Sequence, residues 1–116
     1  MEDCLFCRIA RGEIPSRKVY EDEDIFAFHD INAQRPMHLQ VIPKRHIESL
    51  ATVAADDAPV LGKMLAIAGR LASENGSPDG FRVIINNGRV GGQEVQHLHA
   101  HIVGGPDPVG PMLKRN

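Results

Sequence analysis

Three histidines alternate with apolar residues in the run His97-Leu98-His99-Ala100-His101-Ile102-Val103. In an extended strand, successive side chains point to opposite faces, and like-facing Cα atoms lie roughly 6.5–7 Å apart. The pattern therefore predicts a strand over 97–103 whose three imidazoles share one face while the apolar residues face a core. No other segment constrains the fold as strongly, because this one requires a sheet with one buried and one polar face.

Three interpretations of this histidine row fit its residue types. The first is a solvated strand face. The second is a catalytic zinc site, in which two neighbouring histidines of the row bind the ion together with His38 or Glu94. The third is a histidine nucleophile beside a phosphate. The glycine-rich segment over 88–94 favours the third, because backbone N–H groups in such a turn can face an anion.

The other elements are predicted from residue spacing. An apolar stripe at intervals of three and four predicts one long helix, which Asp56 or Asp57 caps, Pro59 starts and Asn75-Gly76 ends. The stripe consists of Leu61, Met64, Leu65, Ala68, Leu71 and Ala72. A short helix is expected over 4–11, and strands over 18–21, 25–29, 39–42, 82–86 and 97–103, with 83–85 buried. This order of elements predicts an α+β fold with an antiparallel sheet.

Composition narrows the classes of partner. The length of 116 residues fits one domain, and the formal net charge of -2 lacks the basic excess of a general nucleic-acid binder. The start Met1-Glu2-Asp3 has neither the basic residues nor the apolar run of a signal peptide or membrane-spanning helix. We therefore expect a cytoplasmic protein that binds neither nucleic acid nor membrane.

Two cysteines, Cys4 and Cys7, form a C-x-x-C pair. In a cytosolic chain such a pair is typical of a metal site or a redox pair. A redox pair is expected where a strand of a βαβ unit runs into a helix, and no such strand precedes Cys4. The pair therefore favours zinc over redox chemistry, with two half-buried cysteines of no special role as the third alternative.

The histidine row and four further segments resemble the histidine triad (HIT) family. The segments are Cys4-Leu5-Phe6-Cys7-Arg8-Ile9, Gly12-Glu13-Ile14-Pro15-Ser16, Ala27-Phe28-His29-Asp30-Ile31-Asn32 and Val41-Ile42-Pro43-Lys44-Arg45-His46-Ile47. They occur in family order and cover nearly the whole chain. The ending, with Gly104-Gly105 and Gly110-Pro111-Met112, is similar to bacterial members of the Hint branch, the purine nucleoside phosphoramidases. The resemblance implies a single HIT domain over 1–116, with a tail over about 106–116. Its sheet would be five-stranded and antiparallel, with one long and one short helix, and would continue into that of a second chain in a homodimer.

The resemblance also implies roles for individual residues. His99 matches the nucleophile that forms a covalent nucleotidyl-histidine, and His101 and His38 match the histidines that hold the phosphate oxygens. Asp30 matches the acid that binds the ribose, with the alternative that it only caps a turn. The remaining nucleotide-binding matches are Ile31, Phe6, Ile9, Phe28, Asn86, Gly92, Gln93 and Glu94. Phe28 and Ile31 are alternatively plain core residues.

A structural zinc ion on Cys4, Cys7, His46 and His97 is implied as well. In members without metal, His97 instead helps to relay a proton, and one imidazole nitrogen cannot do both. Glu94 departs from the serine of many eukaryotic members, and its carboxylate would repel a phosphate unless it is turned away, protonated or paired. The expected activity is hydrolysis of purine nucleoside phosphoramidates, such as AMP or GMP derivatives, without magnesium. The alternative functions are a nucleotide-binding regulatory module with little turnover and a metal-dependent hydrolase.

Overall fold

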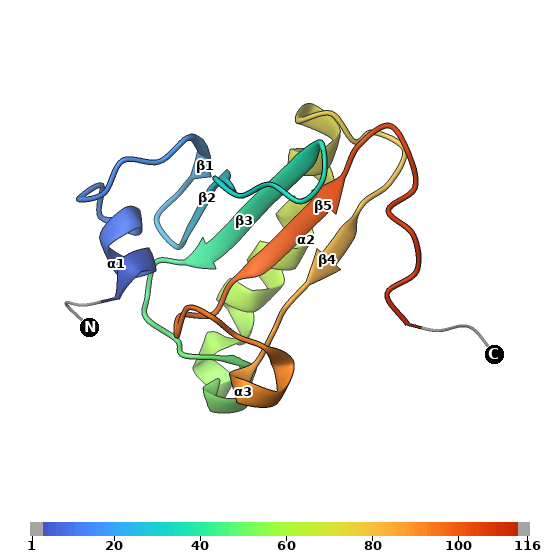
Figure 1. Cartoon of the computed structure of the whole chain (residues 1–116). Coiled ribbons are helices and arrows are strands. Elements are labelled where there is room, and N and C mark those ends of the chain that lie inside the picture. The colour runs from blue at the N-terminus through green and yellow to red at the C-terminus, as the bar shows by residue number, and fades with distance from the viewer. Residues whose placement is uncertain (1–3, 114–116) are drawn as a thin grey trace.

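The computed structural model describes residues 4–113, which form one sheet flanked by helices (Figure 1). The elements in chain order are α1 (Leu5–Ala10), β1 (Lys18–Glu21), β2 (Ile25–His29), β3 (Met37–Pro43), two short 3-10 turns (Leu50–Thr52 and Ala55–Asp57), α2 (Ala58–Glu74), β4 (Arg82–Ile84), α3 (Gly88–Gly91) and β5 (Ala100–Gly104). The strands are ordered β1-β2-β3-β5-β4, and every neighbouring pair is antiparallel. The predicted α+β fold with five antiparallel strands, one long helix and one short helix is confirmed. No described helix is long and apolar enough to cross a membrane.

Both faces of the central strands are covered, which explains their nearly continuous apolar sequence. Ile25 and Ala27 of β2 face α2, which crosses behind the sheet in Figure 1 and buries Met64 and Leu71 against it. The alternate residues of β2 belong to a second apolar cluster on the opposite face, formed with α1. This cluster consists of Phe6, Ile9, Phe26, Phe28 and Ile42. The face of the sheet opposite α2 therefore carries an apolar wall beside α1.

The histidine segment differs from the prediction in its strand length. β5 begins at Ala100 and not at His97, although Leu98, Ala100 and Ile102 are buried as expected. The ladder between β3 and β5 ends at the pair of Val41 with Ala100. Just beyond that pair Pro43 has no N–H to donate, and its carbonyl oxygen lies 2.8 Å from His97 Nε2. The imidazole thus takes the place of a backbone partner.

The structure differs less from the sequence prediction at the ends of the other helices and strands. β3 extends the predicted strand to Met37–Pro43, and β4 stops at Ile84, with 83–85 only partly buried. The glycine-rich segment contains the additional helix α3. Asp57 precedes α2 as predicted, but it does not cap a helix N–H, because Ala54 N and Arg45 engage its carboxylate. Leu65, placed in the apolar stripe, is 54% exposed.

Gly104 at the end of β5 lets the backbone pass close to Ser77, which lies between α2 and β4. A Cβ there would lie 2.9 Å from Ser77 Cβ. The Ser77 hydroxyl also donates to Gly80 O and accepts from Gly105 N.

We expect Gly104→Ala to lower the unfolding free energy by about 2–4 kcal/mol, because the clash with Ser77 and the loss of these hydrogen bonds add. Urea denaturation measures the change. Gly62→Ala is the matched control, since its Cβ meets nothing within 4 Å and should stabilise α2 by up to about 1 kcal/mol; equal effects of the two substitutions would contradict the prediction.

Candidate functional site

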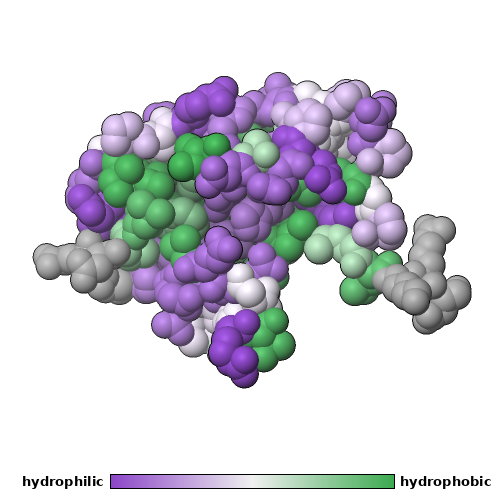
Figure 2. Space-filling view, in the orientation of Figure 1, coloured by the Kyte–Doolittle hydropathy of each residue, from purple (hydrophilic) through white to green (hydrophobic). Residues whose placement is uncertain are grey.

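A cavity of about 510 Å³, here called the main cavity, opens on the sheet face opposite α2. It is enclosed by α1, the end of β2, strands β3 and β5, and the loop after α3. Of the predicted nucleotide-binding and catalytic residues, the following line it: Phe6, Ile9, Phe28, Asp30, Ile31, His38, Asn86, Gly92, Glu94, His99 and His101. Figure 2 shows the apolar part of this face near α1 and the hydrophilic part over the centre of the sheet.

The apolar end of the main cavity is built from aromatic contacts. The Phe6 ring meets the Phe28 ring edge-on at 5.7 Å between centroids and the His99 ring at 5.1 Å. Phe28 is 5% exposed, so it is both a core residue and a wall of the cavity. Ile31 is 90% exposed, which excludes the alternative that it is plain core. A flat apolar ligand could stack here without specific polar contacts.

His99 is held in one tautomer by the backbone. Its Nδ1 lies 2.7 Å from the carbonyl oxygen of His97. A carbonyl only accepts hydrogen bonds, so Nδ1 carries the proton and Nε2 of the neutral ring carries the lone pair. The ring is 5% exposed and contacts His101 edge-on at 5.0 Å. Such an imidazole is oriented like an activated nucleophile.

His38 and His101 form a directed chain of hydrogen bonds. Gln34 N donates to His38 Nδ1 at 3.0 Å, which leaves the proton of the neutral His38 ring on Nε2. This Nε2 lies 3.0 Å from His101 Nδ1 and 3.3 Å from Asp30 Oδ2. His101 Nδ1 thus accepts, and its protonated nitrogen is Nε2, a donor for an anion. Burial lowers the pKa of His38, against the opposing charge of Asp30.

The same protonation pattern argues against a metal ion bound by the histidines of the main cavity. Asp30, His38 and His101 offer ligand atoms within 4.8 Å of one another. His38 Nε2 carries the proton, however, and His99 Nδ1 is occupied by a carbonyl. A metal ligand must present a lone pair, so an ion on His38 Nε2 would cost the hydrogen bond from Gln34.

A second cluster joins Cys4, Cys7, His46 and His97, whose ligand atoms all lie within 4.8 Å of one another. His97 Nδ1 is 3.2 Å from Cys4 Sγ and 3.5 Å from Cys7 Sγ, and His46 Nδ1 is 3.3 Å from Cys7 Sγ. Tetrahedral zinc with its usual bond lengths would place sulfur and nitrogen about 3.6 Å apart. The donor set and its spacing therefore fit zinc.

The tautomer of His97 supports the same fit. Its Nε2 donates to the Pro43 carbonyl, so Nδ1 presents its lone pair to the two sulfurs, as second-shell bonding arranges in zinc sites. Burial lowers the pKa of His97 to about 4, so the ring is neutral. Burial and the neighbouring Cys4 raise the pKa of Cys7 to about 11, and a bound cation would reverse that shift. Neither nitrogen of His97 is left for a proton relay.

The HIT domain family model matches residues 11–107. The chain belongs to the HIT family. Protein HitA of Neisseria gonorrhoeae is 50% identical over 106 residues, which are 91% of this chain and 99% of that protein. Purine nucleoside phosphoramidase of Escherichia coli (strain K12) is 44% identical over 113 residues, 97% of this chain and 94% of that protein. A crystal structure of a histidine triad protein from Clostridium difficile has 43% identity, covers 96% of this chain and 97% of its own, and superposes with a TM-score of 0.89.

One sequence interpretation of the glycine-rich loop is corrected in this HIT domain. Gln93 does not line the main cavity, because its side chain bonds Gly88 N, Glu48 O and Val95 O and so fastens the loop. The loop was also expected to offer backbone N–H groups to a phosphate, and this stays a prediction. The N–H groups of Gly91 and Gly92 donate to carbonyl oxygens within the loop, while Gly92 and Glu94 line the main cavity.

Gln40 was not predicted from the sequence. Its Nε2 donates to Asp30 Oδ2 at 2.8 Å, while Asn32 N donates to the other oxygen at 2.7 Å, so Asp30 both closes a turn and faces the cavity. Because a carboxylate only accepts, the Gln40 amide orientation is fixed. Gln40 Oε1 is buried without a partner among the described residues. The available signal was a polar residue between Leu39 and Val41, two positions after His38 on the same face.

His101 makes the stability of this HIT domain sensitive to acid. Burial, with smaller contributions from His99 and His38, lowers its pKa to about 4. Between pH 6.5 and 4 the unfolded chain binds this proton and the folded chain does not, so the unfolding free energy falls as the pH falls. From pH 7.5 to 5.0 we expect wild type to lose on the order of 1–2 kcal/mol more than His101→Asn in urea denaturation. The acid response of the cysteine cluster is common to both proteins, and an equal pH dependence would contradict the prediction.

Proposed function

We propose that this HIT protein is a purine nucleoside phosphoramidase, a hydrolase that releases a nucleoside 5'-monophosphate by attack of His99 on the α-phosphorus. The observation that carries the proposal is the hydrogen bond from His99 Nδ1 to the His97 carbonyl, which leaves Nε2 as the nucleophilic nitrogen in the wall of the main cavity. The name of the Escherichia coli relative supports the substrate class.

The reaction would run in two steps. His99 Nε2 forms a bond to phosphorus as the P–N bond to the leaving group breaks, and the leaving nitrogen takes up a proton from solvent and departs as an amine. Water then attacks the nucleotidyl-histidine and releases a proton to solvent, returning the free imidazole and the monophosphate. Splitting one displacement into two lets a better nucleophile than water attack first.

Each wall of the main cavity suits one part of the substrate. The base would stack in the slot of Phe6, Ile9 and Phe28. The ribose hydroxyls would donate to Asp30, whose Oδ1 accepts one backbone N–H and can accept a further hydrogen bond. The phosphate oxygens would accept from His101 Nε2. Because this positioned donor stabilises the anion directly, magnesium is not required.

The deciding experiment is a hydrolysis assay with an AMP phosphoramidate, with and without a strong chelator and added magnesium. Turnover that survives chelation supports the histidine mechanism and opposes a metal-dependent hydrolase. A tightly bound nucleotide without turnover would instead identify a regulatory module.

Because its substrates are nucleotides, we propose that the enzyme works in the cytoplasm.

We further propose that Cys4, Cys7, His46 and His97 bind a structural zinc ion. All four protein ligands are supplied, which is typical of structural rather than catalytic zinc. The ion would join α1 to the chain after β3 and the segment before β5, and so hold Phe6 against the histidine row.

A homodimer is the third part of the proposal. β1 and β4 are the edges of the sheet, and Phe81, just before β4, is 42% exposed. An exposed strand edge with apolar residues offers a template on which a second chain can pair. Sedimentation equilibrium should give twice the chain mass of 12.7 kDa, and a monomer at micromolar concentration would contradict the dimer.

A further inference from the structure

A second cavity of about 480 Å³ adjoins the main cavity, between β4 and the tail. We call it the adjoining cavity. The two cavities share four lining residues, Gln34, His38, Asn86 and His101. A substrate held at the shared histidines can therefore extend into both.

The charged residues of the two cavities differ in sign. Within the described residues 4–113, the main cavity is lined by the carboxylates Asp30 and Glu94 and by no lysine or arginine. The adjoining cavity is lined by Arg35 and Arg82 and by no carboxylate. Neither guanidinium forms an ion pair in this part of the chain. Of the two cavities that His38 and His101 line, only the adjoining cavity is thus lined by arginine side chains.

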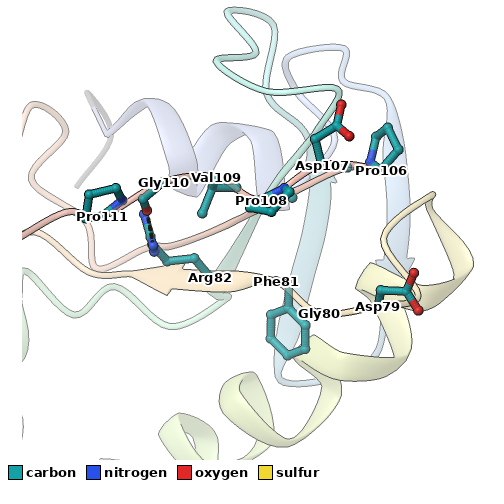
Figure 3. A pocket seen from close by; sticks show the side chains of 12 residues that line it. Asp79, Gly80, Phe81, Arg82, Pro106, Asp107, Pro108, Val109, Gly110 and Pro111 are labelled. Carbon is teal, nitrogen blue, oxygen red and sulfur yellow. Dashed lines mark hydrogen bonds between the residues drawn. The ribbon is translucent and has the colours of Figure 1, made fainter.

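The contacts that these arginines make leave their charge uncompensated. Arg35 donates to the carbonyl oxygens of Gln34 at 2.7 Å and Val109 at 3.3 Å, and Arg82 donates to that of Gly110. Figure 3 shows Arg82 reaching from β4 to the tail at Gly110. A guanidinium has five N–H donors, so both side chains retain donors for a ligand.

The direction of attack selects which part of the substrate enters the adjoining cavity. His99 lines the main cavity alone, whereas His101 lines both. In an in-line displacement the leaving group lies opposite the attacking nitrogen. With the base in the aromatic slot and His99 on one side of the phosphorus, the leaving group would extend past His101 into the adjoining cavity, which Arg35 and Arg82 line.

We propose that the adjoining cavity binds an anionic group on the leaving side of the substrate, through Arg35 and Arg82. The inference rests on the proposed function and names its substrate class. A carboxylate of an amino acid linked to phosphorus through its amine supplies such an anion, and so does the β-phosphate of a nucleoside diphosphate. Guanidinium pairs with either in a bidentate geometry.

The test compares kcat/KM for two AMP phosphoramidates, one made with alanine and one with alaninamide, which differ in one negative charge. We expect wild type to prefer the alanine derivative about tenfold, the effect of one charge-assisted hydrogen bond. The ratio should fall toward one in Arg35→Gln and Arg82→Gln, and Arg35→Lys should retain more of it than Arg35→Gln. Arg70→Gln, on α2 behind the sheet, is the matched control and should keep the wild-type ratio. Release of AMP from ADP, measured in parallel, distinguishes a phosphate from a carboxylate as the preferred anion.

The two proposals fail in different ways. A wild-type ratio near one, with ADP also cleaved no faster than the alaninamide derivative, overturns the anion site while the phosphoramidase activity stands. The anion site is likewise overturned if both arginine substitutions leave the ratio unchanged. If no phosphoramidate is cleaved at all, the proposed function itself is wrong, and the anion site falls with it.

Discussion

His99→Ala is expected to lower the turnover of an AMP phosphoramidate by several orders of magnitude, because the substitution removes the atom that forms the covalent intermediate. Binding of AMP should largely survive, since the aromatic slot and Asp30 lie on other elements. Rapid quench of wild type should trap a nucleotidylated protein that is labile in acid. The same experiment on His99→Ala should show no adduct.

His101→Ala is the matched comparison within the histidine row. It removes a phosphate donor and leaves the nucleophile, so turnover should fall while some adduct still forms. A wild type without adduct, together with a His99→Ala variant that keeps most of its activity, would assign the attack to water or another residue. That pair of results would refute the mechanism.

Cys4→Ser is expected to have the largest effect on stability. Wild type purified without chelator should contain one zinc ion per chain by elemental analysis. The serine variant should lose that ion and about 3 kcal/mol or more of unfolding free energy, because removing one ligand leaves a buried thiol and two imidazoles without their cation. The dissociation constant of AMP should change less, since His38, Gln40 and His101 of the main cavity lie on β3 and β5 and are not zinc ligands.

Ala10→Ser is the control for the zinc prediction, because it places a serine at the opposite end of α1 from Cys4 and leaves the four ligands intact. Its unfolding free energy should match that of wild type within about 0.5 kcal/mol. Its zinc content should equal that of wild type within experimental error. Wild-type protein that contains no zinc would refute the structural ion, whatever the stability of the variants.

Much of the architecture was predictable from local patterns. The alternation of Leu98, Ala100 and Ile102 predicted a buried strand face, and the spacing of Met64, Ala68 and Leu71 predicted the face of α2 that packs on the sheet. These patterns succeed because burial of apolar side chains repeats with the period of the element. Leu65 shows the limit, since spacing alone does not say how wide a face the neighbouring strands cover.

The sequence did not predict the role of a side chain whose hydrogen-bond partner lies far away in the chain. Gln93 was predicted to contact the nucleotide, but its side-chain amide donates to the Glu48 carbonyl and fastens the loop. Gln40 is an unremarkable polar residue in the sequence and becomes the support of Asp30 only when β2 and β3 pair. The contacts of Arg35 and Arg82, on which their proposed role rests, likewise depend on where the tail passes.

By itself the sequence determined the elements, the family and the identity of most residues around the main cavity, because periodicity and motif are local properties. Only the tertiary structure decided the protonation pattern of the histidines. The carbonyl of Pro43 fixes His97, the carbonyl of His97 fixes His99, and the N–H of Gln34 fixes His38. Which nitrogen of an imidazole carries its proton depends on the partner that the other nitrogen meets, and that partner is set by the fold.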